Sequence, residues 1–349
     1  MLAWALFGAT ALLQAARVAL SDGDDLQARI ATASGGDILE LGTGTYSGFV
    51  LSDRSFSAER PLVIRAAPGA RPVLRKDGHA GYLAKLHNVS YLVLEGLVFE
   101  GSNQPVYATS VEHLLLIRIA FTNTGQEAIH IRGTSRHIDI IGCRISHTGH
   151  TQPQWAEGIY LGSGQPPFEL VEHVWIEGNE IHHTGNSEAI NLKARSHHVT
   201  IRRNHIHDIA PGTPTQHNEA AISCEAADRG FRPGEDPDIW IEENTIHDIR
   251  FGRWANGIKV STAGGRLVRN VIRDCAQHGI AFNAYDDGPG AFTAVLHDNT
   301  IEACAAGPLG PSELRYEQRD PGANPNRPQD WYVPAGAREG APQGRDDAP

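Results

Sequence analysis

The segment from Asn186 to Arg195 holds the residues best suited to acid–base chemistry, and it reads Asn-Ser-Glu-Ala-Ile-Asn-Leu-Lys-Ala-Arg. Glu188 stands at the start of a short apolar strand pattern, and Lys193 follows it by five residues. A lysine has an ordinary pKa of about 10.4, so it acts as a base only where burial or neighbouring cations lower that pKa. The competing interpretation makes Lys193 a solvated side chain that pairs with Glu225.

Strand patterns of the same kind recur along the chain and would place other polar side chains in line with this segment. They cover residues 128–131, 158–161, 189–192, 221–224, 257–260 and 279–282. Side chains alternate between the two faces of a strand, so the isoleucine of each pattern faces one way and the next residue faces the other. The expected inward column is Ile129, Ile159, Ile190, Ile222, Ile258 and Ile280, and the expected outward column is His130, Tyr160, Asn191, Ser223 and Lys259. A second outward column contains Arg132, Gly162, Lys193, Glu225, Ser261 and Asn283.

These outward columns contain the side chains that could assist a reaction at Lys193. Tyr160 and His130 can donate a proton to a departing oxygen. Lys259 could lower the pKa of Lys193 by adding a second positive charge nearby. Candidate substrate-binding residues on the same columns are Arg132, Asn191 and Glu225.

Three glutamates precede successive strand patterns and should align with one another. They are Glu127, Glu157 and Glu188, and Glu219 lies close to the equivalent position of the next pattern. Carboxylates stacked one strand spacing apart repel each other unless water or a cation such as calcium screens them. Charge runs are usually solvated, so solvated carboxylates at a turn are the commoner explanation, and a calcium site is the alternative.

A second strand pattern precedes an asparagine at 179, 204, 244, 270 and 299, at intervals of 25, 40, 26 and 29 residues. A period near 25 built from short β-branched runs predicts a solenoid whose copies stack because none of them can fold alone. Two or three parallel strands per coil make this an all-β chain, a parallel β-helix. Asparagine tolerates left-handed turns and can bond from coil to coil, so the asparagine column is expected to be structural. Two histidine columns, 113–137–173–198 and 182–207–247, are interpreted in the same way.

The entry to this solenoid, with Gly35-Gly36-Asp37 before a strand and Gly44-Thr45-Tyr46 after it, resembles the first coils of the pectate-lyase-like superfamily. The resemblance extends over about residues 25 to 305. It implies a right-handed parallel β-helix, in agreement with the right-handed crossover rule.

The segment around Lys193 is similar to the chondroitinase-B and alginate-lyase family of β-helical polysaccharide lyases. That resemblance implies that Glu188 binds calcium, that Lys193 removes the proton next to a uronate carboxylate, and that an arginine on the next coil assists the departing oxygen. Asn186 stands where the family has a second acidic ligand, and Glu157 could add a further ligand. Glu225 occupies the position of the arginine, so the substitutes within reach are Arg195, Lys259, Arg132 and His130.

The sequence therefore predicts a polysaccharide lyase that cleaves a uronate-containing glycan by β-elimination in a groove on one face. One alternative is a glycoside hydrolase, which needs two carboxylates about 5–10 Å apart and for which Glu225, Asp286 and Asp287 are candidates. Another alternative is a surface or glycan-binding module without catalysis.

The composition of the chain and the sequences of its two ends indicate where the protein is located and which classes of partner it binds. The 349 residues carry a formal charge of −11, which argues against non-specific nucleic-acid binding. The apolar run at 2–13 is too short to anchor the chain in a membrane, and we interpret residues 1–20 as a signal peptide or an N-terminal cap of a secreted or periplasmic protein. Residues 21–306 should form the β-helix, and residues 307–349, rich in Pro and Gly, an irregular or disordered tail that could wrap the helix with Trp331 and Tyr332.

Cys275 and Cys304 should be neighbours on adjacent coils and could form a disulfide if the protein is exported.

Overall fold

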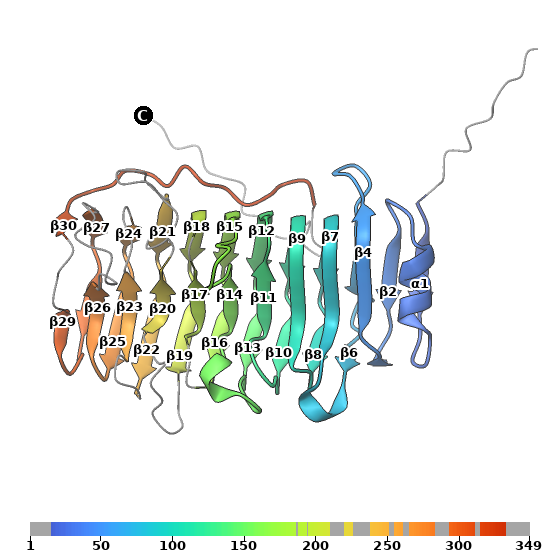
Figure 1. Ribbon diagram of the computed structural model, residues 1–349, viewed down its shortest axis with the longest axis horizontal. Coiled ribbons are helices and arrows are strands. Elements are labelled where there is room, and N and C mark those ends of the chain that lie inside the picture. Colours follow the sequence, from blue (N-terminus) through green and yellow to red (C-terminus); the bar gives the residue numbers. More distant parts are fainter. Residues whose placement is uncertain are drawn as a thin grey trace, which may run out of the picture.

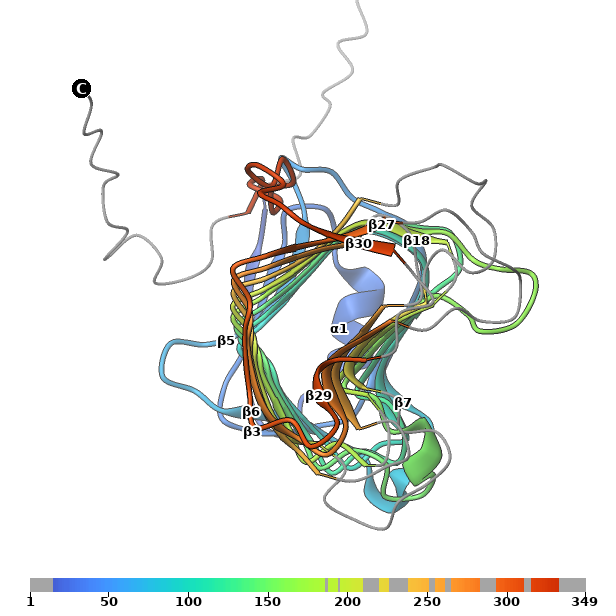
Figure 2. The same cartoon turned by 90° about the vertical axis from the view of Figure 1, so that its left-hand side faces the viewer.

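The structure is a computed structural model, and it describes residues 15–185, 188–193, 195–209, 220–225, 238–250, 255–260, 265–282, 293–310 and 315–332. The chain winds into a parallel β-helix, with one strand of each coil lying beside its counterpart in the next (Figure 1). Viewed along the axis, the coils superimpose as a prism with three walls (Figure 2). We call these walls faces A, B and C.

Face A contains the strand patterns around Lys193. It is formed by β4 (Phe49–Ser55), the first halves of β7 (Tyr82–Glu95) and β9 (Gln104–Ile117), β11 (Ile129–Arg132), β14 (Ile159–Leu161), β17 (Ile190–Leu192), β20 (Ala220–Cys224), β23 (Asn256–Val260), β26 (His278–Phe282) and β29 (Gly307–Leu309).

Face B continues from face A around a sharp corner. It is formed by β1 (Arg17–Leu20), β2 (Ile38–Leu41), β5 (Leu62–Ala66), the second halves of β7 and β9, β12 (Ser135–Ile141), β15 (Val171–Glu177), β18 (Ser196–Arg202), β21 (Ile239–Glu242), β24 (Gly265–Val268), β27 (Thr293–His297) and β30 (Arg315–Gln318).

Face C is a separate ten-stranded sheet. It is formed by β3 (Gly44–Tyr46), β6 (Pro72–Arg75), β8 (Val98–Glu100), β10 (Ala120–Thr122), β13 (Arg144–Ser146), β16 (Glu180–His182), β19 (His205–Ile209), β22 (Thr245–Ile249), β25 (Val271–Cys275) and β28 (Thr300–Glu302). Short 3-10 helices at Asp77–His79 and Pro153–Trp155 lie in the connecting turns.

On face B, five successive coils each have a residue in the left-handed conformation at the equivalent position. Tyr91, His113, His137, His173 and His198 have φ between 50° and 57°. Histidine is among the residues that adopt this conformation more readily than most. Their rings stack along the axis, with centroids 4.1–4.9 Å apart. The first histidine column is thus a feature of strand geometry, as the sequence indicated.

The interior is apolar and follows the predicted inward column. The six isoleucines from Ile129 to Ile280 pair in register from coil to coil and are fully buried. Complete burial of such a side chain contributes about 1.5–3 kcal/mol. Because every coil contributes one, the stacking of coils supplies the core that no single repeat has.

The asparagine column forms the predicted ladder inside the turn between faces B and C. The amide nitrogens of Asn179, Asn204, Asn244 and Asn270 each donate to the side-chain oxygen of the next member, at 2.9–3.0 Å, and the ladder ends at Asn299. Each of these amides also donates to a backbone carbonyl of the preceding coil, at 2.8–3.0 Å. Buried polar groups are stable only when they are bonded in this way.

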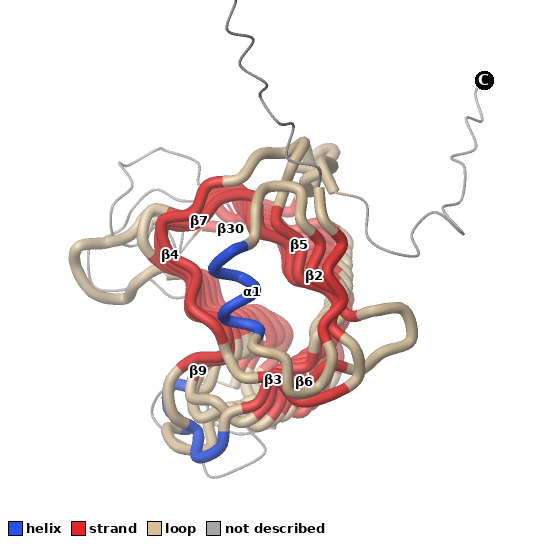
Figure 3. Tube along the Cα trace, turned by 90° about the vertical axis from the view of Figure 1, so that its right-hand side faces the viewer, coloured by secondary structure: helices blue, strands red, loops and turns tan. Residues whose placement is uncertain are grey.

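The N-terminal end of the prism is closed by α1 (Leu26–Thr32), which lies across the opening (Figure 3). Asp25 caps this helix by accepting from the backbone of Ala28, and Leu26 and Ile30 are buried against the first coil. Residues 17–20, at the end of the range interpreted as a signal peptide or cap, form β1 and pair with β2. No helix within the described ranges is long and apolar enough to cross a membrane.

The C-terminal tail is more ordered than the sequence indicated. Residues 307–309 and 315–318 are strands of the last coils, and residues 319–332 then run back over the coils along one edge of face B (Figure 1). We call residues 319–332 the strap. The Asn324 amide donates to Thr200 and Glu242, the Gln329 backbone N–H donates to Asp139, and Trp331 and Tyr332 pack on an outer apolar cluster of Val63, Val93, Leu115 and Ile117. Residues 307–309 and 315–318 are thus strands, whereas residues 319–332 are irregular and lie over the coils with Trp331 and Tyr332, as the sequence suggested. Residues 311–314 and 333–349 lie outside the described part.

The predicted disulfide is not formed. Cys275 and Cys304 are free thiols, although they interact as neighbours on adjacent coils. That thiol–thiol interaction lowers the pKa of Cys304 to about 7.

Candidate functional site

The three aligned glutamates of face A are buried, which corrects the expectation of solvated carboxylates. Glu127, Glu157 and Glu188 have relative exposures of 5%, 2% and 3%. Backbone bonds from Ala128 to Glu157 and from Gly158 to Glu188 place the three on successive coils. Glu127 accepts a bond from the Gln104 amide at 2.7 Å, whereas one buried oxygen of Glu157 has no hydrogen-bond partner among the described residues. Burial, together with the charges of Glu188 and Glu127, raises the pKa of Glu157 well above its usual value.

The outward column beside these glutamates has the register that the sequence predicted. His130 pairs with Tyr160, Tyr160 with Asn191, Asn191 with Ser223 and Ser223 with Lys259. His130, Asn191, Ser223 and Lys259 are buried although they point away from the inward isoleucines. Burial lowers the pKa of His130 to about 4 and raises the pKa of Tyr160 to about 12. At neutral pH both side chains are therefore uncharged.

Lys193 lies between Tyr160 and Glu225. Its ammonium nitrogen is 2.8 Å from a carboxylate oxygen of Glu225 and 5.6 Å from the centre of the Tyr160 ring. The ion pair in the competing interpretation is thus present, but it is not solvated, because the two side chains are only 15% and 17% exposed. Burial alone would lower the pKa of Lys193, yet the charges of Glu225 and Glu188 outweigh it and raise that pKa. The lowering that a base role requires is absent from this arrangement, because the nearest charges are negative.

The other predicted site residues are separated from this group. Arg132 forms a bidentate pair with Glu169, with contacts of 2.8–3.1 Å. Arg195 is exposed and donates to the carbonyl of Phe168. Lys259 lies two coils beyond Asn191. The candidate residues that lie outside the described part of the chain are Asn186, Glu219, Asp286 and Asp287.

The structure adds an aromatic row that the sequence patterns did not reveal. Ring centroids are 4.8 Å apart between Tyr82 and Tyr107, 5.3 Å between Tyr107 and His130, and 4.7 Å between His130 and Tyr160. The row leads along face A towards a cavity of about 410 Å³ lined by Arg75, Lys76, Tyr82 and Lys85, among others. The sequence did contain a signal for this row, because Lys85, Tyr107 and His130 occupy equivalent positions on neighbouring strands. The row was missed because β7 and β9 are long strands that lack the four-residue pattern.

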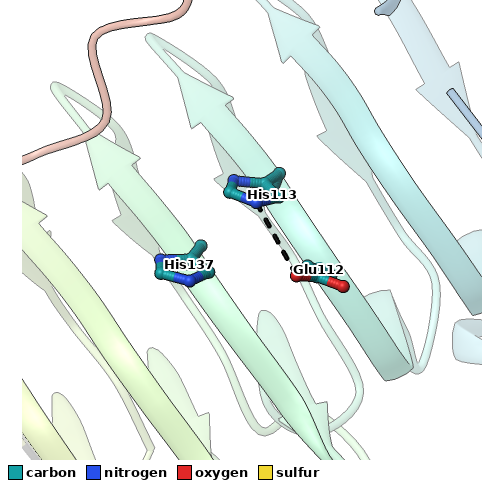
Figure 4. A group of neighbouring side chains, drawn as sticks. All are labelled: Glu112, His113 and His137. Carbon is teal, nitrogen blue, oxygen red and sulfur yellow. Dashed lines mark ion pairs between the residues drawn. The ribbon is translucent and has the colours of Figure 1, made fainter. Parts of the chain in front are cut away.

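Among the described residues, three groups of His and Glu side chains bring donor atoms within 4.8 Å of one another, and all lie away from Lys193. They are Glu112–His113–His137, Glu172–His197–His198 and Glu180–His205–His207. In the first group, shown in Figure 4, the two imidazole rings are stacked nearly parallel, with an interplanar angle of 4°. Glu112 there is already paired with Arg136 at 2.9 Å.

Comparisons with known proteins agree with this architecture. A family profile described as "Right handed beta helix region" matches residues 82–229. No curated protein sequence matches the chain. An alginate lyase from Paenibacillus sp. str. FPU-7 superposes with a TM-score of 0.70 at 19% identity, covering 86% of this chain and 99% of that one. The catalytic domain of a GH87 α-1,3-glucanase in complex with nigerose gives 0.57 at 12% identity (87% and 68%), and pectate lyase Pel9A gives 0.50 at 12% identity (82% and 70%). With its parallel strands, its stacked asparagines and these matches, the chain is a right-handed parallel β-helix protein.

Proposed function

We propose that the protein is a polysaccharide lyase that cleaves a uronate-containing glycan by β-elimination on face A. The observation that carries this proposal is the half-buried group of Tyr160, Lys193 and Glu225 at the end of an aromatic row. The likeness in fold to an alginate lyase and a pectate lyase supports it. Fold alone does not confer activity, so the chemistry of Tyr160, Lys193 and Glu225 has to support the proposal.

The row and the basic cavity suit a linear, anionic polymer. Aromatic side chains offer flat apolar faces, and Tyr82, Tyr107 and His130 offer them in sequence along the solenoid axis. Arg75, Lys76 and Lys85 place positive charge at the far end in a chain whose formal charge is −11. A local basic cluster of this kind can attract an anion despite the overall charge.

In the proposed reaction, neutral Lys193 removes the proton on the carbon next to the uronate carboxylate. The electrons of that C–H bond form a double bond to the neighbouring carbon, whose bond to the glycosidic oxygen breaks. The Tyr160 phenol gives its proton to the departing oxygen. Since Glu225 and Glu188 hold Lys193 in its charged form, the reaction needs alkaline pH or a charge that neutralises them.

Glu157 and Glu188 are suited to hold calcium. Two buried carboxylates on adjacent coils, one with an unbonded oxygen, offer the oxygen ligands that calcium prefers. Bound there, the ion would supply positive charge to mask the uronate and to favour neutral Lys193.

A glycoside hydrolase is the second candidate. Burial and the neighbouring carboxylates raise the pKa of Glu157 well above its usual value, which favours the protonated form that a general acid needs, and Glu127 and Glu188 flank it. The likeness in fold to an α-1,3-glucanase is in line with this. A glycan-binding module without catalysis is the third. We also propose that the protein is secreted or periplasmic, where such polymers are found.

Incubation with a panel of uronate polysaccharides, followed in the near ultraviolet, distinguishes the three. The new double bond of an elimination absorbs there, hydrolysis produces reducing ends without absorbance, and a binding module produces neither. We expect absorbance from the wild type, and less of it after chelation, with recovery on adding calcium but not zinc. New reducing ends without absorbance would replace elimination by hydrolysis, and activity indifferent to chelation would remove the calcium proposal.

A further inference from the structure

A second cluster of chemically capable side chains lies on face C, on three successive coils. Glu180 of β16 pairs in register with His205 of β19, and His207 of β19 pairs with His247 of β22. His205 and His207 are two residues apart on one strand, so their side chains lie on the same side of the sheet. The four side chains therefore form one outward-facing patch that spans β16, β19 and β22.

Two of these histidines are held in the orientation that metal ligands require. The Nδ1 atom of His207 is 2.9 Å from Asp208, and the Nδ1 atom of His247 is 2.7 Å from Asp248. A carboxylate at Nδ1 makes that nitrogen the protonated one and leaves the lone pair on Nε2. Ligating histidines in proteins are usually supported by such a carboxylate or carbonyl.

The donor atoms of Glu180 and His205 lie close to the Nε2 lone pair of His207. Glu180 Oε1 lies 3.5 Å from His207 Nε2. The donor atoms of Glu180, His205 and His207 all lie within 4.8 Å of one another, and His205 Nε2 also contacts His247 Nε2 at 2.9 Å. Zinc–nitrogen bonds of 2.0–2.1 Å in a tetrahedron separate the ligand atoms by about 3.3 Å, which is close to the Glu180–His207 distance.

His207 gives an independent sign that the patch accepts a cation. Its Nε2 atom is buried and has no hydrogen-bond partner among the described residues. An imidazole lone pair buried without a donor is costly. The nearest group is the Glu180 carboxylate, which can only accept, so a cation between them would satisfy both.

The other two His–Glu groups lack this arrangement. His113 already uses Nδ1 to contact Gln329 at 2.6 Å, and its ring lies parallel to that of His137. His197 and His198 face each other through their Nδ1 atoms at 2.6 Å. On face C, Arg144 contacts only the second oxygen of Glu180, at 3.3 Å, so Oε1 remains directed at His207.

We propose that Glu180, His205 and His207 bind one zinc ion, or another divalent transition metal that favours imidazole, with water as the remaining ligand, as a clamp between β16 and β19 on face C. Imidazole nitrogens with one carboxylate are a donor set that zinc commonly takes. The clamp acts on a wall other than the one that carries Lys193, so its role is to stabilise the stack of coils. Metal that binds only the folded chain raises its melting temperature.

The test uses the full chain without a histidine tag, stripped of metal, and titrates zinc by calorimetry while thermal unfolding is followed in parallel. We expect one zinc per chain and a higher melting temperature with zinc. Cobalt should bind at the same site and give the intense visible bands of a four-coordinate ion. His207→Gln should weaken zinc binding at least tenfold, and Asp208→Asn, which keeps the ligand but loses its orientation, should weaken it less.

His113→Gln is the matched control, because it removes a stacked histidine from the other column. It should leave zinc affinity unchanged. The proposal fails if the wild type takes up no zinc, or if His113→Gln reduces binding as much as His207→Gln does. Should His207→Gln unfold the chain, Asp208→Asn decides instead, since it leaves all three ligands in place and must still lower the affinity.

Discussion

At the scale of single residues, the environment of Lys193 is the feature on which the proposed reaction depends. A buried lysine usually loses its proton more easily, but two carboxylates reverse that effect here. The reaction should therefore proceed faster as pH rises, because the neutral amine is the reactive form.

Lys193→Ala tests this residue directly. We expect turnover to fall by about 10²–10⁴-fold, the usual contribution of a positioned acid or base, with unchanged circular dichroism. Arg203→Gln is a suitable control, since it removes another cation paired with a carboxylate, Glu243, away from face A. Full activity of Lys193→Ala would exclude the residue as the base.

Glu225→Gln tests the electrostatic part of the argument. Removing a negative charge beside an ammonium group disfavours its charged form, so the pKa of Lys193 should fall. The alkaline rise of kcat/KM should move to lower pH by roughly 1–3 units. Glu169→Gln, which alters the Arg132 pair instead, should leave the profile in place. A profile that does not move with Glu225→Gln would show that Lys193 is not the titrating group.

At the scale of the elements, the asparagine ladder joins neighbouring coils at the turn between faces B and C. Asn204 accepts from Asn179 and donates to Asn244, and all three are fully buried. Removing the Asn204 side chain leaves both Asn179 and Asn244 with one hydrogen-bond partner fewer. The loss in stability should therefore exceed that of a single hydrogen bond.

We expect Asn204→Ala to lower the free energy of unfolding by about 2–4 kcal/mol, measured by urea denaturation, because more than one buried polar group loses its partner. Asn326→Ala, which removes a single bond between the strap and Asp238, should cost less. Equal losses would mean that the ladder adds nothing beyond an ordinary hydrogen bond.

At the scale of the whole molecule, the strap joins the two ends of the solenoid. It begins at the last coils and covers apolar side chains on the outside of the early ones. Asp139, which accepts the Gln329 N–H at 2.8 Å, is buried beneath it, and burial raises its pKa to about 7.

The raised pKa of Asp139 should make the docking of the strap depend on pH. The pKa of Asp139 is higher in the folded chain than its ordinary value of 3.8, so the folded state favours the protonated form. The contribution of protonated Asp139 to the free energy of unfolding is complete below about pH 4. As pH rises towards 7 that contribution is lost, and the free energy of unfolding falls by at most about 4 kcal/mol. Asp139→Asn should remove this loss, and the variant should exceed the wild type in urea resistance at pH 8 more than at pH 4. A constant difference between the two proteins across that range would contradict the assignment.

The repeat made the fold and much of the site predictable. The inward isoleucines, the asparagine ladder and the alignment of His130, Tyr160 and Asn191 all follow from nearest-neighbour stacking, in which one register repeats from coil to coil. The ion pair of Lys193 with Glu225, which belonged to the competing interpretation of Lys193, is present for the same reason.

What the repeat could not determine depends on contacts between segments distant in the sequence. Whether Glu157 and Lys193 are solvated, and hence in which direction their pKa values move, is decided by what covers them and which charges face them. The path of the strap depends on Trp331 and Tyr332 meeting an outer apolar cluster that lies more than 200 residues earlier in the chain. The histidines of face C looked like products of repetition in the sequence, and only the tertiary structure showed that Asp208 and Asp248 contact the Nδ1 atoms of two of them. Composition and period determine how coils stack, whereas desolvation and side-chain orientation arise only once the coils and the strap are in place.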